Sequence, residues 1–291
     1  MPRISFVNGN YLPHEQATVP IEDRGLQFSD AVYEIISFFG GKPLDLIPHL
    51  ERLKKSLEGL SIKYDVEKGY FLDLLEQMIA KNKISDGIIY IQITRGVAPR
   101  DHAFPKGKIT PTIIATIRPL DMEAIRNRLT NGVKIITVAE NRWGRPDIKS
   151  TSLLGNVLAK EAAAREGAYE AVYFDHHGIV TEGASSNVWM VNNEGILVTR
   201  KTDGKILPGI TRLAVVKTQK GAVKGIEERP FSRDALKTAR EIFLTSTTSF
   251  VMPAVNLDGK SVGDGKPGPV TRVLQKAYQK YIKEQTGQTV F

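Results

Sequence analysis

Three short segments combine residue types that could carry chemistry. Lys149 lies in the segment 145–151, Arg-Pro-Asp-Ile-Lys-Ser-Thr, and a lysine amine can serve as a nucleophile or a general base. The segment 180–187, Val-Thr-Glu-Gly-Ala-Ser-Ser-Asn, is rich in small hydroxyl residues. The segment 207–212, Leu-Pro-Gly-Ile-Thr-Arg, opens a predicted helix without an acidic residue in its first turn, so its backbone N–H groups could hold a phosphate. Each also has an ordinary explanation: a surface lysine, a turn and a simple helix start.

The first part of the chain predicts strands and helices that would position such residues. Residues 31–39 are apolar and aromatic, and Gly40-Gly41 follows them as a strong hairpin signal. Leucines recur at helical spacing from residue 50 to residue 60, and Pro48 suits a first helical position. We further predict a helix at 67–81 and strands at 87–94 and 111–117.

The rest of the chain indicates a second domain. The polar stretch 118–132 is predicted to be an interdomain linker, with enough Leu and Ile for a short helix. It separates an N-terminal α+β domain, 1–117, from a C-terminal α+β domain, 133–291, that carries Lys149. In the latter we predict strands at 133–138, within 171–191 and at 241–245, and helices at 153–165, 209–220 and 269–283. The predicted fold class is therefore α+β, in two domains with the ligand between them.

Composition limits the classes of function. The 291 residues suit two domains, and the absence of cysteine excludes disulfides, thiol nucleophiles and cysteine-ligated metals, as expected in a reducing cytoplasm. The net charge of +8 could favour nucleic acid, but the basic residues are mixed with acids and form no nucleic-acid motif. The start lacks a signal-peptide core, and no apolar run approaches the roughly 20 residues that span a bilayer. We expect a cytoplasmic protein without nucleic-acid or membrane partners.

The order of several motifs along the chain is specific. They are Asp23-Arg-Gly, Val32-Tyr-Glu, His49-Leu-Glu-Arg-Leu, Asp147-Ile-Lys, Thr181-Glu-Gly-Ala-Ser-Ser-Asn, Gly209-Ile-Thr-Arg and Thr245-Ser-Thr-Thr-Ser. Over nearly the whole chain this set resembles the fold-type IV pyridoxal-phosphate enzymes. That family contains branched-chain aminotransferases, D-amino-acid aminotransferases, aminodeoxychorismate lyases and some amine transaminases. The resemblance implies pyridoxal 5′-phosphate as the cofactor, held at the domain interface, and a homodimer.

The resemblance also implies roles for individual residues. Lys149 would hold the cofactor as a Schiff base and then move the proton at the substrate Cα. Glu182 would face the pyridine nitrogen, and Arg52 would bind the phosphate bidentately. The other implied cofactor contacts are Ser185, Ser186, Ile210, Thr211, Ser246 and Thr247.

The resemblance implies that Tyr33 lies beside the substrate carboxylate site and that His49 supports it, although a strand tyrosine and a helix N-terminal histidine would look the same. Trp143 and Trp189 are predicted to be packing residues. His176 and His177 are predicted to be turn residues, so no metal ligand is expected.

One segment separates the members of the family. Residues 94–105, Thr-Arg-Gly-Val-Ala-Pro-Arg-Asp-His-Ala-Phe-Pro, resemble the loop of bacterial D-amino-acid aminotransferases in which a Pro-Arg-x-His pair grips the substrate carboxylate. The resemblance implies that Arg100 and His102 bind substrate, and that the enzyme moves an amino group between D-alanine or D-glutamate and 2-oxoglutarate or pyruvate. Asp101, Ala184 and Pro208 depart from that type. The alternatives are a branched-chain L-amino-acid aminotransferase, then an aminodeoxychorismate lyase or an (R)-amine transaminase.

Overall fold

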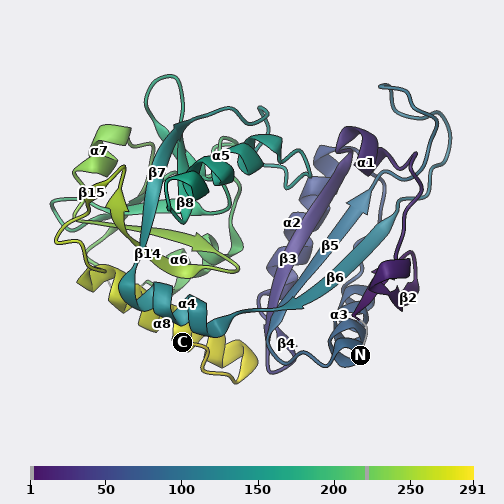
Figure 1. Ribbon diagram of the computed structural model, residues 1–291, viewed down its shortest axis with the longest axis horizontal. Helices are drawn as coiled ribbons and strands as arrows, with labels where there is room; N and C mark the ends of the chain where they lie inside the picture. The colour runs from purple at the N-terminus through teal and green to yellow at the C-terminus, as the bar shows by residue number, and fades with distance from the viewer. Residues whose placement is uncertain (1–2, 220–222) are drawn as a thin grey trace. The chain divides into compact units, whose positions relative to one another are not determined.

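The computed structural model describes residues 3–219 and 223–291 (Figure 1). The chain divides into two compact units. Unit 1 comprises Met1–Leu120, Ile148–Ser152 and Gln285–Gln288, and unit 2 comprises Asp121–Asp147, Leu153–Glu284 and Thr289–Phe291.

Unit 1 is built on a six-stranded sheet in the order β2-β1-β6-β5-β3-β4, in which every pair is antiparallel. Its strands are β1 (Ile4–Val7), β2 (Asn10–Pro13), β3 (Ala31–Phe39), β4 (Lys42–Pro43), β5 (Gly87–Thr94) and β6 (Ile113–Pro119). The strands predicted at 31–39 and 87–94 are confirmed. Gly40 and Gly41 both have positive φ, 55° and 74°, as the tight β3–β4 turn requires. The strand predicted at 111–117 begins two residues later, because Pro111 has no N–H to donate to the sheet.

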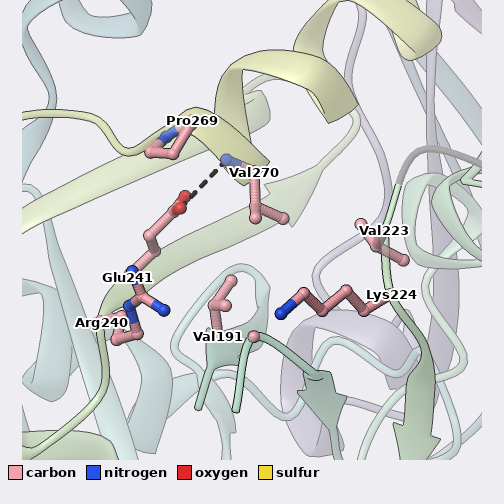
Figure 2. Close-up of a pocket in the computed structure, with 8 residues that line it drawn as sticks. Val191, Val223, Lys224, Arg240, Glu241, Pro269 and Val270 are labelled. Carbon is pink, nitrogen blue, oxygen red and sulfur yellow. Dashed lines mark hydrogen bonds between the residues drawn. The ribbon is translucent and has the colours of Figure 1, made fainter. Parts of the chain in front are cut away.

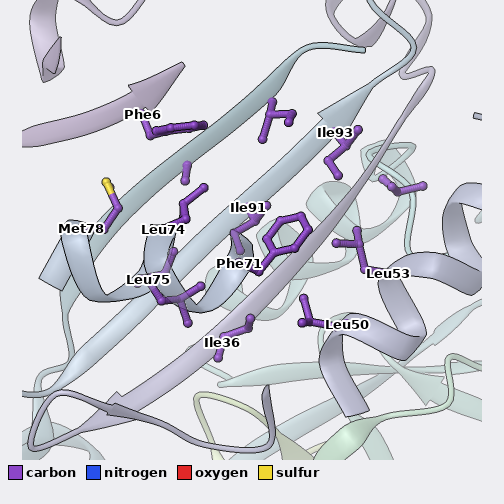
Figure 3. Packing of buried hydrophobic residues seen from close by; sticks show 14 of the residues in the cluster. Phe6, Ile36, Leu50, Leu53, Phe71, Leu74, Leu75, Met78, Ile91 and Ile93 are labelled. Carbon is purple, nitrogen blue, oxygen red and sulfur yellow. The ribbon is translucent and has the colours of Figure 1, made fainter. Parts of the chain in front are cut away.

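Helices α2 (Leu46–Gly59) and α3 (Lys68–Asn82) cover one face of this sheet, and α1 (Arg24–Phe28) and the short 3-10 helix η1 (His14–Gln16) precede β3. Figure 3 shows the core between the two long helices and the strands, with Leu50, Leu53, Phe71 and Leu74 directed at Ile36 and Ile91. Both predicted helices are confirmed. Pro48 is the third residue of α2 rather than the first; the position is tolerated because first-turn N–H groups have no partner within a helix.

The alternation of β3 decides which side chains share a face. Val32, Glu34 and Ile36 are fully buried on the helix-covered face, whereas Tyr33 and Ile35 are half-buried and point the other way. Glu34 is thus a carboxylate placed inside an apolar core.

Segment 148–152 is joined to the start of β3. The N–H of Tyr33 donates to the carbonyl of Lys149 at 2.9 Å, and the N–H of Thr151 donates to that of Ala31 at 3.1 Å. These bonds explain why Lys149 groups with unit 1, although the sequence placed it in a domain beginning at residue 133.

Unit 2 is built on a mixed nine-stranded sheet in the order β12-β11-β10-β13-β14-β7-β8-β9, with β15 paired to β14. The pairs β11–β12, β14–β7 and β7–β8 are parallel. Its strands are β7 (Val133–Ala139), β8 (Glu170–Phe174), β9 (Val180–Gly183), β10 (Asn187–Val191), β11 (Leu197–Thr199), β12 (Ile226–Glu228), β13 (Glu241–Ser246), β14 (Phe250–Leu257) and β15 (Lys260–Ser261). The helices are α4 (Met122–Asn131), α5 (Leu154–Arg165), α6 (Ile210–Thr218), α7 (Arg233–Lys237) and α8 (Pro269–Thr286).

Most predicted elements of unit 2 are present. The predicted linker 118–132 contains α4, whose N-terminus is capped by Asp121 and whose Ile125 and Leu129 are buried. Lys220, the last residue of the helix predicted at 209–220, lies outside the described residues, as do Met1 and Pro2. Strand β14 was not predicted; it contains Pro253, a residue type disfavoured in strand interiors.

The α+β class is confirmed by the mixture of these elements. The two tryptophans differ: Trp189 is buried and donates to Thr245, whereas Trp143 is 37% exposed, so its prediction as a packing residue is wrong. Within the two described stretches, no helix is long and apolar enough to cross a membrane.

Candidate active site

The amine of Lys149 lies over the ring of Tyr33, 4.2 Å from its centroid. The backbone of Lys149 is held on both sides, by the Tyr33 N–H and by a bond from its own N–H to Ser56 Oγ at 3.2 Å. Among the described residues the amine itself has no hydrogen bond and no ion pair. A lysine whose backbone is fixed and whose amine is not engaged in a hydrogen bond or an ion pair with the described residues is suited to act as a nucleophile.

Tyr33 belongs to a polar and aromatic patch on the face of the unit 1 sheet opposite α2 and α3. Its ring stacks on that of Tyr90, with centroids 5.4 Å apart, and the Tyr90 hydroxyl donates to Gln92 at 2.7 Å. Sequence reasoning missed Tyr90 and Gln92, which read as ordinary members of an alternating strand.

On the covered face, Glu34 joins Arg52 and His49 of α2 in a buried cluster. Arg52 donates from Nε and Nη2 to the two carboxylate oxygens, each at 2.8 Å, and His49 Nδ1 lies 2.8 Å from Glu34 Oε2. Burial works to raise the pKa of Glu34, but the charge of Arg52 and the hydrogen bonds from Arg52 and His49 outweigh it and lower that pKa to about 2. Burial also lowers the pKa of His49, despite Glu34. Glu34 therefore fixes the direction of the Arg52 guanidinium.

Glu182 of β9 is a buried carboxylate in unit 2. It accepts from Arg142 Nη1 at 2.5 Å, from Asn187 Nδ2 at 3.0 Å, and from the N–H of Leu207 at 3.0 and 3.1 Å. Burial raises the pKa of Glu182 to about 7, even though Arg142 and the Leu207 N–H work to lower it. This carboxyl is therefore partly protonated and partly ionised near neutral pH.

The start of α6 packs against Asn187, which also donates to Glu182. Asn187 Nδ2 also donates to the Leu207 carbonyl at 3.0 Å, and a Cβ on Gly209 would clash with Asn187 Oδ1. Only glycine allows this approach. Gly209 adds no side-chain cap, and the buried residues Ile210 and Thr211 open the helix, so its first N–H groups are suited to an anion.

The predicted serines have hydrogen-bond partners of their own. Ser185 Oγ and Ser186 Oγ donate to the buried Glu170 of β8, at 2.6 and 3.1 Å. Ser246 Oγ accepts from the N–H of Ser249 at 3.1 Å, and Thr247 is half-buried in the turn after β13. Glu170 therefore orders the turn between β9 and β10.

The loop at 94–105, which is predicted to bind the substrate carboxylate, packs against Phe28. The guanidinium carbon of Arg100 lies 5.1 Å from the centroid of the Phe28 ring, and the His102 ring centroid lies 5.4 Å from it. Arg24 lies 4.7 Å from the same ring and donates to the carbonyl of Asp101 at 2.6 Å. Arg100 and His102 are exposed, and the structure brings them together on one aromatic surface.

A separate cavity of about 430 Å³ lies beside the start of α8 (Figure 2). Its lining includes Val191, Lys224, Arg240 and Glu241. Glu241 accepts from the N–H groups of Val270 and Thr271 and so caps α8. None of the predicted site residues lines this cavity.

Two other predictions concern metals and turns. His176 and His177 lie in the turn between β8 and β9, as predicted, where their ring centroids are 3.9 Å apart. In the parts of the chain that the structure describes, no group of three or more His, Asp or Glu side chains could hold a metal ion.

The predicted site residues are distributed over both units. Unit 1 holds Lys149, Arg52, Tyr33, His49, Arg100 and His102, and unit 2 holds Glu182, Ser185, Ser186, Ile210, Thr211, Ser246 and Thr247. Sequence reasoning missed the residues that hold them: Glu34, Arg142, Glu170 and Asn187. The motifs that contain Glu34 and Asn187 offered the available signal.

A lysine amine that has no hydrogen bond among the described residues and a buried carboxylate are groups that an aminotransferase requires. The model of the amino-transferase class IV family matches residues 31–257. The chain belongs to that family, whose fold is fold type IV.

Curated relatives match almost end to end. The D-alanine aminotransferase of Staphylococcus haemolyticus is 42% identical over 284 residues, covering 97% of this chain and 98% of that protein. That of Staphylococcus aureus strain MSSA476 is 41% identical over 281 residues, with coverages of 96% and 97%. That of Bacillus licheniformis is 38% identical over 283 residues, with coverages of 97% and 98%.

Solved structures show the same fold. The branched-chain amino acid aminotransferase of Escherichia coli is similar with a TM-score of 0.88 at 26% identity, over 99% of this chain and 96% of that chain. A hypothetical aminotransferase from Mycobacterium tuberculosis, solved in its PLP-bound form, has a TM-score of 0.83 at 20% identity, over 97% of this chain and 99% of that chain.

Proposed function

We propose that this chain is a D-amino-acid aminotransferase that uses pyridoxal 5′-phosphate to move an amino group between D-alanine or D-glutamate and 2-oxoglutarate or pyruvate. The observation that carries the proposal is the anchoring of Arg100 and His102 on the ring of Phe28. Two exposed side chains that can donate to one carboxylate suit capture of an amino acid by its α-carboxylate. Relatives named D-alanine aminotransferase, 38–42% identical over nearly the whole chain, support the same substrate class.

The residues present fit the cofactor in three respects. Lys149 offers an uncommitted amine, the start of α6 has no acidic residue to repel a phosphate, and Glu182 is a buried carboxylate suited to a ring nitrogen. When bound, pyridoxal phosphate supplies an aldehyde carbon that reacts with amines and a ring that withdraws electrons from the substrate Cα.

Each residue then has a distinct task. Lys149 Nζ holds the cofactor and takes the proton from the substrate Cα. Glu182 holds a proton at the ring nitrogen. Arg52, with its direction set by Glu34, binds the phosphate together with the N–H groups of Ile210 and Thr211.

The remaining predicted contacts support these tasks. Ser185 and Ser186, ordered by Glu170, shape the ring pocket, and Ser246 and Thr247 add hydroxyls for the phosphate. We propose that Tyr33 lies beside the substrate carboxylate and that His49 acts through Glu34, to which it is bonded.

A half-reaction screen tests the assignment. Purified enzyme is mixed separately with D-alanine, D-glutamate, L-leucine and (R)-1-phenylethylamine, and the cofactor absorption is followed as it converts to the pyridoxamine form. The two D-amino acids should convert the band fastest. Faster conversion by L-leucine would instead favour the branched-chain alternative, and faster conversion by the amine would favour an amine transaminase. A lyase would release pyruvate from aminodeoxychorismate.

Borohydride reduction tests the lysine. The reduced cofactor should remain on one peptide, which contains Lys149, and Lys149→Ala should lose both the label and turnover. A label on any other lysine would contradict the assignment.

We also propose a homodimer in the cytoplasm. Leu154, Val157 and Leu158 form a stripe at helical spacing on α5 and are 54–73% exposed, and such apolar surfaces mark association sites. Sedimentation of the wild type and of Leu154→Glu tests the dimer. The cysteine-free sequence is compatible with a reducing compartment.

A further inference from the structure

Arg142 lies between two carboxylates in unit 2 and has only 5% of its side chain exposed. Its Nε and Nη2 donate to the two oxygens of Glu140, at 2.8 and 2.6 Å, and its Nη1 donates to Glu182 at 2.5 Å. Its backbone N–H donates to Glu140 as well, at 3.1 Å. Glu140 therefore orients the guanidinium so that one edge is presented to Glu182.

We propose that Arg142 is a positioning residue that fixes the direction of the Glu182 carboxylate and favours its ionised form. The proposal rests on the proposed function, in which Glu182 faces the cofactor ring nitrogen. Arg142 does not touch the substrate in this assignment. It acts only through Glu182.

The groups around Glu182 explain why such a residue is needed. Burial is the largest influence on the carboxyl, and it favours the neutral form. Asn187 and the Leu207 N–H donate to it without carrying charge. A neutral carboxyl would not favour a protonated ring nitrogen. The positive charge of Arg142 therefore matters because it favours the ionised form of Glu182 near neutral pH.

Two further titratable groups face the cluster. Glu140, at the end of β7, opposes Arg142 because its negative charge raises the pKa of Glu182. Tyr173 of β8 lies under the guanidinium, with its ring centroid 4.5 Å from the guanidinium carbon, and burial raises the pKa of its hydroxyl. Tyr173 therefore stays neutral in the working range, and the balance is set by Arg142 against Glu140.

This balance predicts opposite effects for two neutral substitutions. Arg142→Gln removes the cation and should raise the pKa of Glu182 by about 1–3 pH units, the usual effect of an adjacent arginine. Glu140→Gln keeps an acceptor for Arg142 but removes the opposing charge, so it should lower that pKa. A merely structural role would not give opposite signs.

The test follows Glu182 directly. Protein labelled with ¹³C at the glutamate carboxyl carbon is titrated by NMR, with and without cofactor, and the Glu182 signal is assigned by its loss in Glu182→Gln. The pH profile of the D-alanine half-reaction is recorded for the same variants. Arg142→Lys is the conservative rescue. Arg145→Gln is the matched control, because Arg145 is 56% exposed and pairs with Asp147 in the same segment.

In Arg142→Gln, we expect the pKa of Glu182 and the rising limb of the rate profile to shift together to higher pH. In Arg142→Lys both should return part of the way, and in Arg145→Gln neither should change. An unchanged titration in Arg142→Gln, or an upward shift in both Arg142→Gln and Glu140→Gln, overturns the proposal. If Arg142→Gln does not fold, the downward shift in Glu140→Gln still decides it. The NMR titration does not depend on turnover, so a wild type that fails the half-reaction screen refutes the proposed function separately.

Discussion

Replacing Glu34 by glutamine tests the buried cluster that fixes Arg52. Glu34 is fully buried, and its pKa of about 2 lies below the ordinary value of 4.5. At about 1.4 kcal/mol per pH unit, the difference corresponds to roughly 3 kcal/mol of stability at pH 7. Because the folded-state pKa is lowered, this stabilisation is complete above pH 4.5 and is lost as the pH falls toward 2. At pH 3 it should be about 1 kcal/mol.

The assay is urea unfolding of wild type and Glu34→Gln at pH 7 and at pH 3, at one protein concentration. Cofactor is removed first, since a ligand bound to the folded state would add its own stabilisation. The difference in unfolding free energy should be roughly 3 kcal/mol at pH 7 and should shrink to about 1 kcal/mol at pH 3.

Glu51→Gln is the matched control, because Glu51 is an exposed carboxylate on the same helix. It should change stability by no more than about 0.5 kcal/mol at either pH. If Glu34→Gln loses the same free energy at both pH values, the loss comes from packing, and the ionised carboxylate is not what stabilises the cluster.

Three other substitutions address the remaining parts of the site. Arg52→Ala should weaken cofactor binding by about 2–5 kcal/mol in equilibrium dialysis, the usual cost of breaking a buried charge-assisted contact; unchanged retention would leave Arg52 as a structural residue. Arg100→Leu should lower kcat/KM for D-alanine roughly ten- to a hundredfold through a raised KM. It should affect (R)-1-phenylethylamine far less, because that amine has no carboxylate. Equal losses for both substrates would refute the role of Arg100 in binding the carboxylate. Gly209→Ala places a Cβ against Asn187 Oδ1, so it should cost about 1–3 kcal/mol in thermal unfolding, and an unaffected variant would show that the α6 start can shift.

Local patterns in the sequence predicted most elements of the fold. The apolar run at 31–39 with two glycines after it, and the spaced leucines of α2, depend on contacts between near neighbours in the chain, so they can be read without a structure. The polar stretch at 118–132 was harder, because only Ile125 and Leu129 of α4 are buried, and two apolar residues give a weak signal.

The motif order predicted the family and the residue types that the chemistry requires. It named Lys149, Glu182 and Arg52, because an enzyme of this kind requires an amine for the cofactor aldehyde, a carboxylate for the ring nitrogen and a guanidinium for the phosphate. It also singled out Arg100 and His102, which the structure places together on Phe28.

Only the tertiary structure decided how these groups are held and charged. Glu34 is distant from Arg52 in sequence, and Arg142 is distant from Glu182, yet each pair is bonded and buried. The pKa of a carboxyl depends on its burial and on the charges beside it in space, and neither can be read from neighbours along the chain. By itself, therefore, the sequence determined which side chains were available and in what order. Folding determined that Glu34 and Glu182, both buried glutamates, have pKa values of about 2 and about 7.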